Sequence, residues 1–180
     1  MTTTVAELAA GTWAGDPVHS HIAFQVRHMG IGRVRGTVLT VGDDGLGSGS
    51  VTAVVDAATV HTGNDQRDQH VRSADFLDVQ RYPTIELTST GVRDLAGPTF
   101  TLLGDLTIHG VPRPVELASR FHGVVSDPSG AERTGFSAVT TISRAAFGVD
   151  IRLLFGAGQV VVADTVEISV DVEFVADGVG

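Results

Sequence analysis

Hydrophobic and polar residues alternate with a period of two along most of the chain. The clearest run lies near the C-terminus, where Val166, Ile168, Val170, Val172 and Phe174 alternate with acidic residues and serine. Successive side chains of a β-strand point to opposite faces, so this pattern is typical of half-buried strands. The same pattern predicts seven earlier strands, at residues 18–26, 34–38, 51–55, 84–88, 100–108, 115–121 and 136–142.

Short segments rich in glycine, aspartate and proline separate several of these runs. They are GDDGLGSG at 42–49, LAGP at 95–98, HGVPRP at 109–114 and DPSG at 127–130, and such residues favour turns. Eight strands with short connectors are typical of an up-and-down antiparallel β-barrel of the lipocalin-like kind, whose closure removes exposed edges. The predicted fold class is therefore all-β.

One segment, VHTGNDQRDQHVRSADFLDVQRYP at 60–83, breaks the alternation. It is too long for a hairpin loop and has helical spacing at Val71, Ala74 and Phe76. Asn64 or Asp65 is a suitable N-cap, so we predict one helical excursion near residues 65–74. Long excursions between barrel strands often serve as a lid or rim.

Length and composition limit the function classes. A chain of 180 residues predicts one domain over 1–180, with a short flexible N-terminus at about 1–12. The net charge is −9 and all twelve basic residues are scattered arginines, which argues against a nucleic-acid partner. Without cysteine or lysine, the chain has no disulfides, thiolate metal site or Schiff-base chemistry.

The sequence also bears on localisation. The N-terminal MTTTVAELAAGTW has no basic region followed by an apolar stretch, the pattern of a secretory signal. No window approaches the roughly 20 apolar residues of a membrane-spanning helix. We therefore expect a cytoplasmic protein.

Histidines raise the question of a metal site. His19 and His21 stand two apart in the first predicted strand and so share a face, where a third ligand would complete a zinc site. Gln25 and Arg27 on the same face equally indicate a solvated outer surface. Ser20 points away from both histidines and the chain has no GxSxG motif. A barrel hydrolase or metal-assisted enzyme stays an alternative, its third ligand being one of His28, His70 and His109.

The predicted helix carries the polar sequence NDQRDQH. Two interpretations are open for it. It is either a solvated helix face with ion pairs of small energetic value, or a polar cluster at the barrel mouth, where Arg67 would meet an anionic head group.

The barrel interior also allows two interpretations. Its predicted inward positions are mostly Val, Ile, Leu and Phe with some Ala, Gly and Ser, and the chain has one Trp and one Tyr. An eight-stranded barrel either packs its interior with side chains or holds one ligand. A filled barrel would suit a stress-response or interaction module. A hollow one would suit an apolar chain, since each buried methylene contributes about 0.8 kcal/mol.

Several motifs together resemble the YceI-like family of polyisoprenoid-binding proteins, from Trp13 to Phe174. They are the tryptophan followed by DPVHSHIAFQVRHMGIGRVRGTV at 16–38, VHTGNDQRDQHVRSADFLDVQRYPTIELTST at 60–90, LLGDLTIHGVPRPVEL at 102–117 and GFSAVTTISRAAFGV at 135–149. Each motif alone is weak, whereas the set is specific.

The resemblance implies a lipocalin-like barrel with a helix over one side and a long apolar tunnel. The ligand implied is an isoprenoid or similar amphiphile, such as a polyprenyl carrier or quinone precursor, with no other cofactor. Family members are often homodimers and are commonly periplasmic or secreted, and transient membrane contact is expected of a lipid carrier. The resemblance carries over no catalytic or metal-binding residue, so the leading hypothesis is a non-enzymatic carrier or storage protein.

The same hypothesis assigns residues. Ser20 is expected to face the tunnel, while Asp16, His19 and His21 are expected at the strand entry or outer face. Arg27, Arg67 and His70 are predicted at the rim, near a head group. The residues predicted to line the tunnel are Val18, Ile22, Phe24, Val26, Ile85, Leu87, Leu102, Leu106, Phe136, Phe147 and Ile168.

Overall fold

The computed structural model describes residues 8–25, 29–42, 45–150, 154–155, 159–160 and 163–176. Within them no helix is long and apolar enough to cross a membrane. In chain order the elements are β1 (Gly11–Gly15), β2 (His21–Gln25), β3 (Met29–Gly42), β4 (Gly45–His61), α1 (Asp65–Arg72), β5 (Thr84–Ala96), β6 (Thr99–Ile108), β7 (Val111–Ser126), β8 (Glu132–Ser143), the 3₁₀ helix η2 (Ala145–Phe147), β9 (Leu154–Phe155), β10 (Gln159–Val160) and β11 (Thr165–Ala176).

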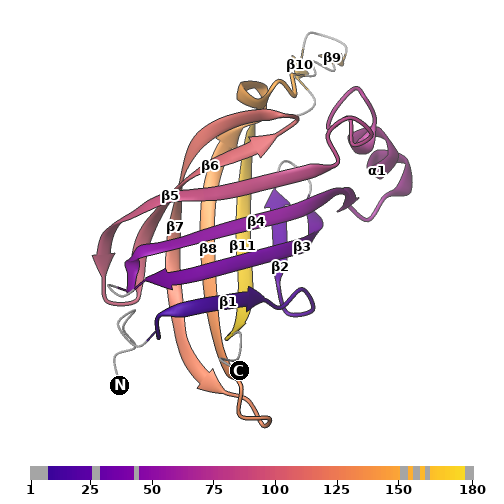
Figure 1. Cartoon of the computed structure of the whole chain (residues 1–180). Helices are drawn as coiled ribbons and strands as arrows, with labels where there is room; N and C mark the ends of the chain where they lie inside the picture. The colour runs from indigo at the N-terminus through magenta and orange to yellow at the C-terminus, as the bar shows by residue number, and fades with distance from the viewer. Residues whose placement is uncertain are drawn as a thin grey trace.

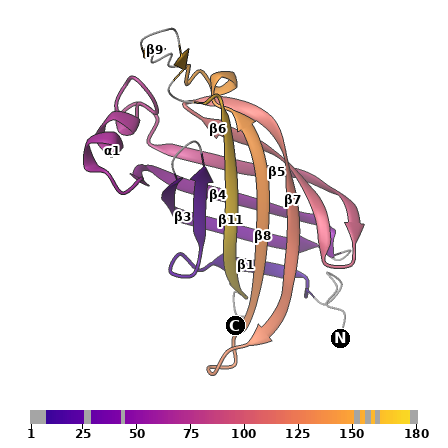
Figure 2. The ribbon, with the colours of Figure 1, turned by 180° about the vertical axis from the view of Figure 1, so that it is seen from behind.

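Eight strand positions close into one antiparallel barrel (Figures 1 and 2). Strands β3 to β8 follow one another around the sheet, and β11 pairs with β8 on one side and with β1 and β2 on the other. The β8–β11 ladder runs without a register shift from Ser143 opposite Thr165 to Arg133 opposite Val175. The predicted up-and-down barrel is confirmed.

Two short strands share the first position of the barrel. Both β1 and β2 pair with β3 and with β11, and residues 16–20 leave the ladder between them. Asp16 Oδ1 accepts the backbone N–H of Val18 at 2.9 Å, which turns the chain out of the sheet. The prediction of one strand over 18–26 is therefore wrong at its start. Before the break, β1 begins at Gly11 and Leu8 is buried, within the segment predicted to be flexible.

The connector between β6 and β7 is a two-residue turn. His109 and Gly110 have φ angles of 54° and 72°, and Ile108 pairs with Val111 across them, as in the turns that match the twist of antiparallel strands. Gly110 has a second constraint, because a Cβ there would lie 2.5 Å from the ring of Tyr82. The turn predicted at this place is confirmed.

Two further predicted turns are confirmed and one is wrong. Gly97, at a φ of 60°, follows the end of β5, and Asp127 Oδ1 accepts the backbone N–H of Ser129 in the β7–β8 connection. The segment 42–49 does not form one long turn, since β4 already begins at Gly45. Small residues suit this strand because a Cβ on Gly49 would lie 2.7 Å from the carbonyl oxygen of Thr40.

Hydrophobic clusters lie toward the two ends of the barrel. In the first, the ring of Phe136 has its centroid 6.2, 5.4 and 5.9 Å from those of Phe100, Phe121 and Phe174, and Trp13 packs in the same cluster. The second comprises Leu106, Ile108, Ile142, Phe147 and Val149, with Phe76 and Leu77 of the segment after α1 packed against it.

Helix α1 lies at the end of the barrel where β4 gives way to β5 (Figure 1). Asp68, whose exposed fraction is 2%, accepts hydrogen bonds from the backbone N–H and hydroxyl of Thr62 and contacts Nδ1 of His61, at 2.8, 2.6 and 2.8 Å. Arg67 donates to Oγ1 and to the carbonyl oxygen of Thr62. These bonds fasten the helix to the end of β4, and above all the Thr62 hydroxyl keeps the pKa of Asp68 below its ordinary value.

The helix ends two residues before the predicted boundary. Asn64 caps its start by accepting the N–H of Arg67, as predicted. At the other end the N–H and the hydroxyl of Ser73 both donate to the carbonyl oxygen of His70, and Ser73 has an extended ψ of 171°. The serine side chain thus takes an acceptor that would otherwise continue the helix.

Trp13 links β1 to the first cluster with an exposed fraction of 2%. Replacing Trp13 with alanine should lower the free energy of unfolding by about 3–5 kcal/mol, because it removes a large side chain that the surroundings cannot refill. Urea denaturation followed by circular dichroism measures this. The control Val125→Ala alters a side chain that is 65% exposed and should change the free energy by less than about 0.5 kcal/mol. Equal effects of the two substitutions would contradict the packing described.

The pKa of Asp68 gives α1 a pH dependence. A carboxylate whose pKa is lowered in the folded state stabilises the fold fully above the unfolded pKa, about 3.9, and loses this contribution as the pH falls through the folded pKa. Hydrogen exchange should therefore show the amides of 62–72 losing protection below about pH 4 before those of β8 do.

The substitution Asp68→Asn should produce the same loss of protection at neutral pH. Asp65→Asn is its matched control, because Asp65 is an exposed acidic residue of the same helix. If Asp68→Asn leaves α1 as protected as Asp65→Asn does, the hydrogen bonds to Thr62 do not hold the helix.

Candidate functional site

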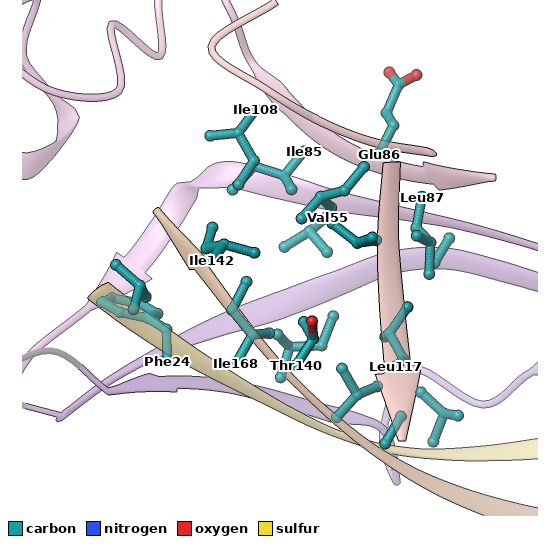
Figure 3. A pocket seen from close by; sticks show the side chains of 18 of the residues that line it. Phe24, Val55, Ile85, Glu86, Leu87, Ile108, Leu117, Thr140, Ile142 and Ile168 are labelled. Atoms are coloured by element: carbon teal, nitrogen blue, oxygen red, sulfur yellow. The ribbon is translucent and has the colours of Figure 1, made fainter. Parts of the chain in front are cut away.

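The barrel encloses a cavity of about 770 Å³, within the range of small-molecule sites. Its wall is mostly apolar and is built from inward positions of β2 to β8 and of β11 (Figure 3). Residues predicted to line a tunnel that the structure places on this wall are Ile22, Phe24, Ile85, Leu87, Leu102, Leu106, Phe136, Phe147 and Ile168.

The period of the strands explains why the wall is apolar. On β5, Ile85 and Leu87 line the cavity, and between them Glu86 is exposed. Figure 3 shows the carboxylate of Glu86 extending away from the cluster formed by Ile85, Leu87 and Val55. Glu86 also borders the cavity, but its side chain turns outward. The apolar side chains of the wall therefore come mainly from every second residue, and the acidic residues that give the chain its charge fall mainly at the alternate positions.

Five of the polar lining residues lie in α1 or just before it. Thr62, Asn64, Gln66, Arg67 and His70 all belong to the lining, and Asn64 and Gln66 are also exposed to solvent. A residue that is exposed and also lines the cavity marks a place where the cavity meets solvent. The cavity therefore opens beside α1, at what we call the mouth, while the aromatic cluster around Phe136 lies toward the opposite end.

The structure places both rim residues predicted on the helix at this mouth. Arg67 holds Thr62 through Nε and Nη2 at 2.7 and 2.8 Å, so much of its hydrogen-bonding capacity serves the loop. His70 packs edge-on against Phe76, with ring centroids 4.9 Å apart, and its Nε2 lies 3.4 Å from Asp75. The polar side chains of the helix thus make local bonds and also line the cavity, and contact of Arg67 with an anionic head group stays a prediction.

Two residues near the first predicted strand depart from expectation. Val18 is 74% exposed and lies outside the cavity, because the turn at Asp16 breaks the strand and with it the alternation that placed Val18 inside. Ser20 is buried, but its hydroxyl accepts the backbone N–H of Glu173 at 3.2 Å, and it does not line the cavity. Val26 and Arg27 lie outside the described residues.

Within the described part of the chain, the histidines proposed as metal ligands do not assemble. His19 lies in the turn and not on a strand, His21 is exposed at the start of β2, His70 is on α1 and His109 packs on Tyr82. His28 lies outside the described residues. The predicted shared face of His19 and His21 is wrong for the reason given for Val18.

A different group brings ligand-type atoms together at the turn. Single atoms of Asp16, His19 and Glu173 lie within 4.8 Å of one another. Arg133 already supplies positive charge there, with Nη1 2.9 Å from Asp16 and Nε 2.9 Å from Asp127. Hydrogen bonds from His19 and then Arg133 hold the pKa of Asp16 well below its usual range. The group ties the turn to the β7–β8 connection.

Sequence reasoning missed several polar cavity residues, among them two buried hydroxyls. Ser119 of β7 and Thr140 of β8 line the cavity with exposed fractions of 7% and 8%. A signal was present, because each hydroxyl occupies the inward phase of an otherwise apolar run, Leu117–Ser119–Phe121 and Ala138–Thr140–Ile142. Arg144 continues the second run, and its guanidinium donates to the carbonyl oxygens of Val149 and Ala163.

Comparison with solved structures shows the same fold elsewhere. BcnA of Burkholderia cenocepacia superposes with a TM-score of 0.72 at 20% identity, over 88% of this chain and 98% of that one. A polyisoprenoid-binding domain from Saccharophagus degradans, implicated in plant cell wall breakdown, gives 0.65 at 17% identity, over 91% and 98%.

Comparison with sequences identifies the family. A UPF0312 protein of Vibrio vulnificus is 34% identical over 139 residues, which cover 74% of each chain. A UPF0312 protein of Pseudomonas putida is 34% identical over 137 residues, 73% of this chain and 71% of the relative. The family model of the YceI-like domain matches residues 13–174. The chain therefore belongs to the YceI-like domain family.

Proposed function

We propose that the protein binds one long-chain isoprenoid lipid inside the barrel and acts as a non-catalytic carrier or store for it. The observation that carries the proposal is the cavity itself, about 770 Å³ with a mostly apolar wall and a group of polar residues at the α1 mouth. At about 0.8 kcal/mol per buried methylene, such a wall favours a long hydrocarbon without directional contacts.

The polar mouth suits an amphiphile. Thr62, Asn64 and Gln66 lie where the cavity meets solvent, and Arg67 and His70 stand beside them. A polar end of the ligand would stay close to water there, while the apolar chain would lie between the clusters of Phe136 and Ile142. The solved domain from Saccharophagus degradans, described as polyisoprenoid-binding, supports this ligand class.

The two rival functions are less well supported. A metal-assisted enzyme would need His19, His21 and a third ligand to converge, and the described histidines are spread over the turn, β2, α1 and the β6–β7 turn. A filled barrel used as an interaction module would leave no large cavity, whereas the inward side chains here enclose one.

A charge placed in the wall should abolish lipid retention. Leu87→Glu puts a carboxylate opposite Leu106 in the apolar wall, where an unpaired charge is costly to bury. Retention of a radiolabelled C20 isoprenoid alcohol after gel filtration should fall more than about tenfold. Leu95→Glu is the matched control, since Leu95 is on the same strand and 52% exposed, and it should retain the lipid as the wild type does.

A second, uncharged variant guards against misfolding of the first. Ala138→Phe places a ring in the cavity and should reduce the bound lipid by occupying its space, while circular dichroism still shows the barrel. If both Leu87→Glu and Ala138→Phe fold and retain the wild-type amount of lipid, the lipid does not occupy this cavity and the proposal is wrong.

A further inference from the structure

We infer that Ser119 and Thr140 form a recognition point for an uncharged oxygen atom of the ligand, an alcohol or a carbonyl, inside the barrel. The inference rests on the proposed function and goes beyond it. It states that the site prefers apolar chains that carry an alcohol or carbonyl oxygen over chains that carry none. Alkanes and alkenes of the same length would lack that group.

The two hydroxyls lie on neighbouring strands, close enough to contact the same ligand atom. Ser119 pairs with Ala138 across the β7–β8 ladder, so Thr140 is its diagonal neighbour on the cavity face. Diagonal neighbours lie about 7 Å apart, which allows one ligand oxygen between them to contact both hydroxyls. Ala138, opposite Ser119 and two residues before Thr140, has a small side chain that leaves this space open to the cavity.

Thr140 lies among apolar side chains. It lies opposite Ile168 of β11 and two residues from Ala138 and Ile142 along β8, and Figure 3 shows its hydroxyl among Ile142, Ile168 and Leu117. Thr140 is more than nine-tenths buried. Among the described residues, no hydrogen bond joins Oγ1 of Thr140 to another group, and this oxygen is not one of the fully enclosed unpaired atoms. It is therefore open to the cavity that Thr140 lines.

An unpaired hydroxyl in an apolar wall is unfavourable, and a ligand oxygen would satisfy it. Ser119 differs, because its hydroxyl donates to the carbonyl oxygen of Leu117 at 3.0 Å and so offers mainly lone pairs. Thr140 can donate to a ligand alcohol or carbonyl, and Ser119 can accept from an alcohol. The ligand oxygen must be uncharged, since Leu117, Ile142 and Ile168 offer no counter-charge.

The position of Ser119 and Thr140 along the barrel axis indicates which part of a ligand they contact. Thr140 is four residues, about 13 Å along a strand, from Phe136 in the aromatic cluster and two residues from Ile142 in the cluster nearer α1. The pair therefore lies within the wall and apart from the polar mouth at Arg67. A ligand bound there buries its oxygen-bearing group in the protein.

A competition experiment tests the inference. Delipidated protein is incubated with equal amounts of geranylgeraniol and the hydrocarbon of the same skeleton that lacks the hydroxyl, and the bound ratio of alcohol to hydrocarbon is measured by mass spectrometry. Thr140→Val keeps the shape of the side chain and removes its hydroxyl, so it should lower this ratio about five- to tenfold. Ser119→Ala should lower it less, and the control Thr141→Val, at an exposed position on the same strand, should leave it unchanged.

The outcomes separate this inference from the proposed function. Comparing ratios between proteins cancels the different water solubility of the two compounds. Hydrocarbon binding by wild type with an unchanged ratio in Thr140→Val would overturn the inference alone. Wild-type protein that binds neither compound would overturn the proposed function and the inference together. Thr140→Val should melt no lower than wild type, because it replaces a hydroxyl that faces the apolar cavity with a methyl group and removes no hydrogen bond among the described residues.

Discussion

The pairing of β8 with β11 is the interaction on which the cavity depends. It joins β11, the last strand of the barrel, to β8, and β11 pairs on its other side with β1 and β2, so the sheet closes. A strand in a closed barrel has one inner and one outer face along its whole length, so the period-two pattern becomes a division between cavity wall and surface. An uninterrupted register from Ser143 to Arg133 keeps that division constant on the two strands that close the barrel.

Both ends of the barrel contribute to the site in different ways. At one end, Phe136 gathers Phe100, Phe121 and Phe174 around it, which gives a rigid apolar boundary. At the other, α1 is held by the buried carboxylate of Asp68, whose bonds to Thr62 replace the β-sheet pairing that the chain leaves after β4. The mouth is thus formed by a fastened helix and not by a loose loop.

Much of this architecture could be predicted from the sequence because alternation is a local signal. It located the eight strand positions and nine residues of the cavity wall, among them Leu87 and Ile168. The helix was predicted from its cap and spacing, and its end was misplaced because the Ser73 side chain competes for the acceptor of His70. Placement at the mouth depends on contacts between Asp68 and Thr62 that helical spacing does not show.

The failures around the first predicted strand share one cause. Asp16 and Pro17 turn the chain out of the sheet between β1 and β2, so the phase read from Val18 and His19 does not apply before His21. Extending the strand alternation back to Val18 wrongly predicted that Val18 and Ser20 face the cavity and that His19 and His21 share a face. Ser119 and Thr140 were missed for a different reason. A hydroxyl among apolar inward residues gives no sign of a binding role in the sequence unless its hydrogen-bond partners are known.

The central claim is that the cavity holds an isoprenoid, and the mass of whatever occupies the purified protein tests it most directly. Native mass spectrometry of untagged protein, followed by organic extraction and analysis of the extract, gives that mass and its composition. The account predicts one bound molecule per chain, an isoprenoid whose composition includes at least one oxygen. A chain that retains no lipid, and that takes up none when isoprenoids are offered, would contradict it.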